Sequence, residues 1–393
     1  MRAEQSIERP FVRLSLINVV SNVTVPLSGL VDTAMLGHLI EIRFLAGVAL
    51  GSVLFDYVYW SFGFLRMGTT GTTAQAVGRG DRHEVRLVLY RSVTLALALG
   101  GLVLLLQAPF RELGFAMLSG TPEVEAAGRE YFNARVWGAP ATLCNFAWIG
   151  WFLGRAESRR ALIVTATANI GNVLLDYLFI LRLGLAAQGA GLATALSQYA
   201  ALAVAVGLFL SGRTRVRWTW SEVFDQAQLS GLIRLNRDIL LRTVCLVTSF
   251  AVFTNISSVF GTTMLAANAI LMRLLVMAAF LIDGVAYACE SLAGILLGRG
   301  DTRTLRRLTR LALWTGVGCA GLVLLPTILR PRWLFGLLTS HADVIAVAVA
   351  HAGWLVPTLL LGAMAFVYDG IYLGLTEGRR LRDSMLILSL IHI

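Results

Sequence analysis

The sequence consists of long apolar runs separated by short tracts that contain arginine. A run of roughly 20 apolar residues is long enough to cross the hydrocarbon core of a bilayer as a helix. Hydrophobic residues make up 57% of the 393 residues and charged residues only 14%, whereas a soluble domain has roughly 25% charged residues. This pattern excludes an ordinary soluble domain and predicts an all-α polytopic membrane protein. The predicted spans cover residues 11–36, 44–70, 87–110, 125–152, 159–181, 187–211, 238–260, 263–297, 305–329 and 343–375, and an eleventh begins near residue 382.

The basic residues indicate how the chain crosses the membrane. The formal net charge is +10, and the sequence contains arginine but no lysine. The arginines gather in alternate tracts between the predicted spans, such as 79–91, 155–160 and 299–310. Cytoplasmic loops of membrane proteins carry this excess of positive charge. We therefore expect a cytoplasmic N-terminus, and we attribute the charge to membrane topology rather than to nucleic-acid binding.

The two halves of the chain repeat each other at an offset of 220 residues. The segment GRGD occurs at 78–81 and again at 298–301, and LGRAESRR at 153–160 matches LGLTEGRR at 373–380. Each matched pair falls on the same predicted side of the membrane, so the repeats are parallel and related by an axis along the membrane normal. The repeat predicts an N-terminal lobe over 1–211, a cytoplasmic linker over 212–237, and a C-terminal lobe over 238–393.

The first span carries a carboxylate on a polar stripe. Asn18, Asn22 and Asp32 fall on one face of a helix, and Pro26 interrupts the backbone hydrogen bonds between them. An ionisable residue inside a membrane helix normally faces the bundle interior or a wet cavity. At the repeat offset Asp32 aligns with Val252. The carboxylate thus belongs to the first half alone, and Pro26 is a candidate hinge.

The fifth span has a similar stripe. Thr165, Asn169, Asn172 and Asp176 share one helix face. Two inward-facing carboxylates in one lobe are unfavourable when both are ionised in a low dielectric, so they form a candidate site for a proton or for Na+. An alternative is that the amide side chains only hold helices together. The predicted cation site contains Asp32, Asp176, Asn172, Asn169 and Asn22.

The second half has acidic residues of its own. Asp283, Tyr287 and Glu290 lie on one helix face in FLIDGVAYACESLAG, and Asp369 lies in FVYDGIYLG. Arg66 and Arg273 could pair with these acids and fix the helix packing instead. The predicted substrate cavity is lined by Asn18, Thr165, Asp283, Tyr287, Glu290 and Asp369.

The sequence gives no sign of an enzyme. The four cysteines lie in apolar runs without a CxxC pair, and the five histidines have no metal-ligand spacing. An intramembrane enzyme would need a nucleophile with its base or a metal motif such as HExxH, and neither occurs. We therefore expect a transporter that needs no cofactor beyond a coupling ion, H+ or Na+.

Seven segments, spread over nearly the whole chain, form a recognisable set. They are PLSGLVDTAMLGHL at 26–39, FLRMGTTGTTAQAVGRGD at 64–81, WFLGRAESRRALIVTATANIGNVLLDYLFI at 151–180, LNRDILLRT at 235–243, AANAILM at 266–272, DGVAYACESLAG at 283–294 and DGIYLG at 369–374. Together they resemble the multidrug and toxic compound extrusion (MATE) family, specifically its DinF-like branch, and the first, third and sixth are fairly specific.

The resemblance implies twelve helices in two six-helix lobes that rock to give alternating access, with the export of organic compounds driven by inward flow of H+ or Na+. In that branch the aspartate that matches Asp32 is the cation or proton site, and the residues that match Asn172 and Asp176 help to form it. Because this chain ends near the start of an eleventh span, we expect a C-terminal lobe that lacks its last helices.

The predicted function is secondary antiport at a bacterial inner membrane. The exported compounds are expected to be organic and cationic because the mid-membrane charges of the first half are acidic, and the protein is expected to act as a monomer among membrane lipids. Two alternatives remain at this stage. One is a flippase for lipid-linked oligosaccharides, which calls for a basic central cavity, and the other is an inactive membrane scaffold.

Overall fold

The computed structural model describes residues 7–118, 120–212 and 218–392, with side chains up to residue 387. The described chain is nearly all helical. Its helices are α1 (Glu8–Gly37), α2 (Ile42–Ser61), α3 (Phe64–Arg79), α4 (Arg82–Leu105), α5 (Gln107–Met117), α6 (Pro122–Arg135), η1 (Val136–Gly138), α7 (Ala139–Gly154), α8 (Ser158–Asp176), η2 (Tyr177–Arg182), α9 (Ala186–Leu210), α10 (Trp220–Val223), α11 (Gln226–Val259), α12 (Thr262–Gly298), α13 (Thr302–Leu329), α14 (Pro331–Gly336), α15 (Ala342–His351), η3 (Ala352–Trp354), α16 (Leu355–Gly374) and α17 (Gly378–His392).

Nine segments of this described chain are long and apolar enough to cross a membrane. The predicted span at 125–152 is not among them, although α6, η1 and α7 follow one another there. Its first part, α6, carries Glu123, Glu125, Arg129 and Glu130 on almost four turns, and its second part, α7, is 16 residues long and includes Trp, Gly, Pro and Asn. The predicted span at 44–70 is two helices, α2 and α3, which meet at a bend.

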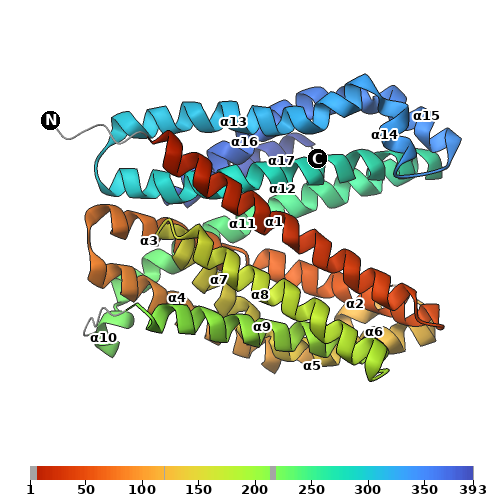
Figure 1. Ribbon diagram of the computed structural model, residues 1–393, viewed down its shortest axis with the longest axis horizontal. Coiled ribbons are helices and arrows are strands. Elements are labelled where there is room, and N and C mark those ends of the chain that lie inside the picture. Colours follow the sequence, from red (N-terminus) through yellow and green to blue (C-terminus); the bar gives the residue numbers. More distant parts are fainter. Residues whose placement is uncertain (1–6, 119, 213–217, 393) are drawn as a thin grey trace.

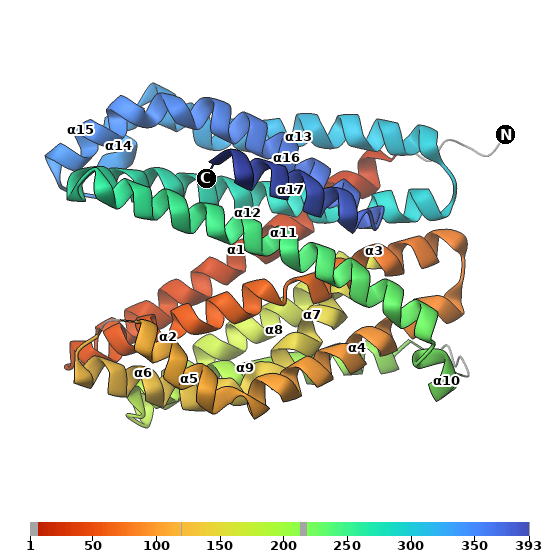
Figure 2. The ribbon, with the colours of Figure 1, turned by 180° about the vertical axis from the view of Figure 1, so that it is seen from behind.

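The helices gather in two halves that lie one above the other in Figures 1 and 2. The first half contains α2 to α9, and the second contains α12 to α17 together with the later turns of α11, whose earlier turns pack Ile239 into the core of the first half (Figure 2). Helix α1 crosses between them. Its first turns pack Phe11 and Leu14 into the apolar core of the second half, whereas its last turns contact α8 and α2 of the first half. A change in the angle between the halves must therefore act on α1.

The sequence repeat is visible in the backbone. Gly80 and Gly300 both adopt positive φ angles, 77° and 73°. Ala156 and Thr376 share a φ of 57° at the same offset. Asp81 and Asp301 each cap the N-terminus of the helix that follows, because their side chains accept backbone N–H bonds. These matches confirm two helical lobes related by a pseudo-twofold axis.

Small residues let the helices approach closely at equivalent places in both halves. A methyl group on Gly150 would clash with the carbonyl oxygen of Arg66, and one on Gly370 would clash with that of Ala286. These two contacts are related by the offset of 220. Each half therefore packs its inner helices in the same way.

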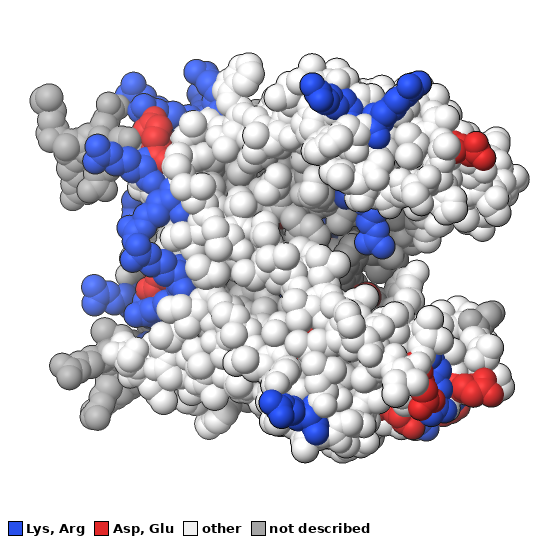
Figure 3. Space-filling model, turned by 45° about the vertical axis from the view of Figure 1, so that its right-hand side comes forward, with Lys and Arg blue, Asp and Glu red and all other residues white. Residues whose placement is uncertain are grey.

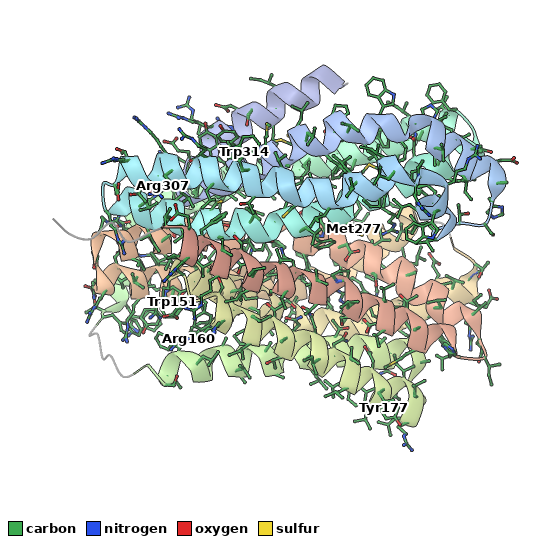
Figure 4. The ribbon with its side chains drawn as sticks, turned by 45° about the horizontal axis from the view of Figure 1, so that its top comes forward. Trp151, Arg160, Tyr177, Met277, Arg307 and Trp314 are labelled. Carbon is green, nitrogen blue, oxygen red and sulfur yellow. The ribbon has the colours of Figure 1, made fainter. Side chains whose placement is uncertain are left out.

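The basic residues gather at one end of the molecule. Figure 3 shows a column of blue side chains along that end, and Figure 4 places Arg160 and Arg307 there, far from Tyr177 at the other end. Arg160 pairs with Glu157 and Arg307 pairs with Glu8. The described part of the linker is at this end too, where Arg91 of α4 donates to the carbonyl oxygen of Glu222 at 2.8 Å. Residues 213–217 of the predicted linker lie outside the described residues.

Candidate functional site

The polar stripes of α1 and α8 face each other. Asn169 Nδ2 donates to Thr24 Oγ1 at 2.8 Å, and Ser28 Oγ donates to Asn172 Oδ1 at 2.9 Å. These bonds follow from the helical period, because polar residues three and four positions apart fall on one face. The two helices are thereby held side by side inside the first half.

The two stripes bring Asp32 and Asp176 together. Their carboxyl groups are close enough to interact electrostatically. Asp176 is 1% exposed, and nothing in the described chain donates a hydrogen bond to either of its carboxylate oxygens or to Oδ1 of Asp32. Buried charges of like sign without donors are costly. The pair therefore calls for a proton or a metal cation from outside the chain.

Oxygen atoms suited to a cation surround this pair. Asn172 lies one helical turn before Asp176, and its Nδ2 donates to Thr194 Oγ1 on α9 at 3.3 Å. Amide, hydroxyl and carboxylate oxygens are the ligands that hard cations prefer. Thr194 was not predicted, because it lies in a run of small residues, GLATALSQ, whose pattern indicates only helix packing. Within the described residues no group of three or more His, Cys, Asp and Glu side chains could hold a metal.

Three other predicted residues lie away from the pair. Asn22 is about 15 Å from Asp32 along the helix, given the rise of about 1.5 Å per residue, and its Nδ2 donates to the carbonyl oxygen of Phe280 on α12 at 3.3 Å. Asn18 is 2% exposed and its Nδ2 has no partner. Thr165 donates to Ala161 of its own helix. The structure thus brings Asn22 to the boundary between the halves rather than to Asp32.

The acids of the second half form a buried charge network with two arginines. Arg66 Nη1 on α3 donates to Glu290 Oε2 at 3.1 Å, and its guanidinium lies 4.0 Å from the ring centroid of Tyr287. Arg242 on α11 pairs with Asp369 on α16 at 2.6 Å. Asp283 lies within electrostatic reach of both arginines. Glu290 has no exposed surface, so in this conformation Glu290 and Asp369 are occupied by ion pairs.

The arginine partners were only partly predicted. Arg66 takes the expected role, whereas Arg273 is exposed and is not part of the network. Arg242 was not predicted as a partner, although it lies within the predicted span 238–260. It is buried because α11 places it opposite Asp369 of α16.

The structure also places an unpredicted arginine inside the first half. Arg135 ends α6, with its guanidinium 4.6 Å from the ring centroid of Phe55 and 5.6 Å from that of Tyr59. It donates to the hydroxyl group of Tyr131. The sequence did not single out Arg135, which lies in the predicted span 125–152. The signal that could have found it is the pair of i, i+4 motifs, Phe55 with Tyr59 and Tyr131 with Arg135, that face each other from α2 and α6.

A cavity of about 790 Å³ lies between the halves, with walls formed mainly by α2 and α11. Its walls combine aromatic and aliphatic side chains with hydroxyl groups. Among them are Asp56, Tyr57, Trp60, Thr248 and Asn255. Figure 3 shows that the molecule is hollowed between its two halves. The cavity is large enough for a small organic molecule.

The sequence of this chain is similar to those of known proteins. A sequence profile of the MatE family matches residues 18–178 and 239–393. The chain is 34% identical over 383 residues to DNA damage-inducible protein F of Escherichia coli (strain K12), a match that covers 97% of this chain and 83% of that protein. It is 31% identical over 200 residues to a probable multidrug resistance protein NorM of Thermotoga maritima, which covers 49% of this chain and 42% of that protein.

A solved structure shares the fold. It is the outward-facing conformation of a multidrug resistance MATE family transporter of the MOP superfamily, with a TM-score of 0.88 at 21% sequence identity, covering 97% of this chain and 86% of that one. The profile match extends over both halves and most of the chain. The expected resemblance and fold are confirmed, and the chain belongs to the MatE family, the multidrug and toxic compound extrusion transporters, in its DinF-like branch.

Proposed function

We propose that this protein is a secondary antiporter that exports organic cations in exchange for H+ or Na+ by alternating access. The observation that carries the proposal is the proximity of Asp32 and Asp176, a half-buried and a buried carboxyl group whose buried oxygens receive no hydrogen bond within the described chain. A pair of this kind binds a proton or a cation more strongly than either group would alone. Family membership supports export as the activity, since one relative is described as a probable multidrug resistance protein.

The site can couple ion binding to movement because its two carboxylates lie on different helices. Asp176 belongs to α8 of the first half, whereas Asp32 belongs to α1, which also packs against α12 of the second half. A bound ion shifts a conformational equilibrium only by its differential affinity for the two states. Neutralising the pair removes the repulsion between α1 and α8 and so favours one angle between the halves. Pro26 is the proposed hinge of α1, between the part that packs on α12 and the part that carries Asp32.

The moving units are the lobes 1–211 and 238–393, joined by the linker 212–237. The arginine-rich end is the proposed cytoplasmic end, which places the N-terminus inside a bacterial cell. A single chain contains both lobes and the site, so the proposed transporting unit is a monomer. Its partners are small organic substrates and the surrounding lipids.

The test is Asp32→Asn in proteoliposomes, measured as counterflow and efflux of an organic cation with a pH gradient and a Na+ gradient imposed separately. We expect the ion dependence of efflux to disappear while the thermal unfolding midpoint changes little. The control is Glu112→Gln, which removes an exposed charge paired with Arg129, and which should leave both unchanged. Wild-type efflux with its normal ion dependence in Asp32→Asn would end the proposal, and a collapse of folding would show that Asp32 serves only packing.

A further inference from the structure

Arg135 is a buried positive charge that the coupling site does not use. Its guanidinium is enclosed by the rings of Phe55, Tyr59 and Tyr131, and its Nε has no hydrogen-bond partner in the described chain. The Tyr131 hydroxyl, which accepts its hydrogen bond, also accepts one from Ser52 Oγ at 3.1 Å. Aromatic faces and one hydroxyl hold a cation without neutralising it. The charge of Arg135 is therefore available to a carboxylate nearby.

Two carboxylates lie within electrostatic reach of this guanidinium. One is Asp32 of the coupling site, and the other is Asp56 on α2. Among the described residues Arg135 forms a direct ion pair with neither, and its Nη1 donates to the hydroxyl group of Tyr131 instead. When the single guanidinium moves closer to one carboxylate, the negative charge of the other carboxylate is less well compensated. Asp32 and Asp56 thus compete for one internal counter-ion.

Asp56 faces the cavity between the halves. Its side chain is exposed, and it is the one charged residue among the described residues that line that cavity. Tyr57 and Trp60 on the same helix are 56% and 55% exposed toward the space that Asp56 faces, and Phe250 of α11 stands across from them. One carboxylate among aromatic rings and hydroxyl groups, in a volume of about 790 Å³, suits a monovalent cation with a bulky apolar body.

We propose that Asp56, Tyr57 and Trp60 form the binding site for an organic monocation in the cleft, and that Arg135 is the internal counter-ion that links this site to Asp32. The inference rests on the proposed antiport and deepens it. When Asp32 is ionised, it attracts Arg135, and Asp56 is free to bind the cargo. When H+ or Na+ neutralises Asp32, the charge of Arg135 acts on Asp56 alone and the cargo is repelled. Exchange follows without any contact between cargo and coupling ion.

The experiment measures the affinity of the purified protein in detergent for tetraphenylphosphonium, a bulky monocation, with and without Na+ and at two pH values. Asp56→Asn should weaken binding at least tenfold. The matched control is Asp343→Asn, an exposed aspartate on α15 outside the cavity, which should bind as the wild type does. Unchanged affinity in Asp56→Asn would overturn the assignment of the site.

The counter-ion role has its own variants. Arg135→Gln should strengthen tetraphenylphosphonium binding and abolish its dependence on Na+ and pH, whereas Arg135→Lys should retain that dependence. If Arg135→Gln does not fold, Tyr131→Phe removes the hydroxyl that holds the guanidinium and should alter the ion dependence in a folded protein. Ion dependence equal to wild type in the folded variants would overturn the link, because a merely structural residue would change stability alone.

These outcomes differ from those that test the antiport itself. If efflux by Asp32→Asn depends on the ion gradients as in the wild type, the proposed function is wrong. The binding measurement on Asp56→Asn still decides whether the cleft site exists. Conversely, unchanged binding in Asp56→Asn removes the cleft site and leaves the pair of Asp32 and Asp176 as the coupling site. The two claims can therefore fail separately.

Discussion

Gly78 of α3 and Gly298 of α12 lie against each other across the boundary between the halves. A methyl group added to Gly298 would stand 2.9 Å from the Cα atom of Gly78, and one added to Gly78 would stand 2.8 Å from the Cα atom of Gly298. Each is the first glycine of a GRGD segment, so a residue near the pseudo-twofold axis meets its own equivalent. The two halves touch backbone to backbone at the arginine-rich end.

Gly78→Ala should force the halves apart at this end. The added methyl group would also clash with the carbonyl oxygen of Ile295, and overpacking of this kind costs roughly 1–3 kcal/mol. The closed arrangement of this end should become less populated. Distance distributions between spin labels attached at positions 82 and 303 would measure the shift. Gly318→Ala on α13 is the control, because nothing lies within 4 Å of the added atom, and a distribution shifted equally in both variants would contradict the prediction.

The ion pair between Arg66 and Glu290 should be strongly stabilising when tested by removal of one partner. Glu290 is fully buried and its other oxygen has no donor in the described chain, so Arg66→Met would strand a buried charge and cost about 3–5 kcal/mol. The double variant with Glu290→Gln should recover part of that loss. Chemical unfolding in detergent gives the four free energies of the cycle. Additive losses would show that the two side chains do not interact.

Pro26→Ala should stiffen α1 and slow transport. Helix α1 runs without a break from Glu8 to Gly37 with Pro26 inside it, although proline removes one backbone hydrogen bond and crowds the preceding turn. Alanine restores that bond and should stabilise the protein by up to about 3 kcal/mol. The measurements are thermal stability and the initial rate of cation efflux. Pro326→Ala, inside α13, should raise stability without slowing efflux, and equal rates in both variants would exclude a hinge at Pro26.

Asp301 should make the start of α13 sensitive to acid. Hydrogen bonds from Thr304 to the Asp301 side chain lower the pKa of Asp301 below its ordinary value. One of them is donated by the backbone N–H of Thr304 to Oδ1 at 2.9 Å. A carboxylate with a lowered folded pKa stabilises the protein at pH values above its unfolded pKa, and that contribution is lost as the pH falls through the folded pKa. The protection factors of residues 302–305 against hydrogen exchange, which correct for the intrinsic rate at each pH, should therefore fall in acid. Asp301→Asn should keep the cap and lose the pH dependence, whereas Asp301→Ala should lose about 1 kcal/mol at neutral pH.

The sequence was sufficient to predict the pair of Asp32 and Asp176 because helical periodicity decides which residues share a face. It was also sufficient for the repeat, since matched residues keep one offset throughout. The interior contacts of Arg135 and Arg242 could not be predicted from the sequence, for a common reason. Both lie within predicted spans, 125–152 and 238–260, but the pattern of one segment does not show which ring or carboxylate of another helix its guanidinium meets. The distance between Asn22 and Asp32 shows a further limit, because a shared face says nothing about separation along the axis.

The glycine contact at the pseudo-twofold axis has a consequence for how a duplicated chain can diverge. A substitution at Gly78 meets the backbone of Gly298, so neither copy can change there without an adjustment in the other. Residues far from the axis contact residues that are not their equivalents, so a substitution there in one copy requires no change at the equivalent position of the other. Asp32 is of the second kind, and the equivalent position holds Val252. The duplication thus leaves a contact that both copies must share and interiors that each copy can change independently, as Asp32 in one half and Val252 in the other show.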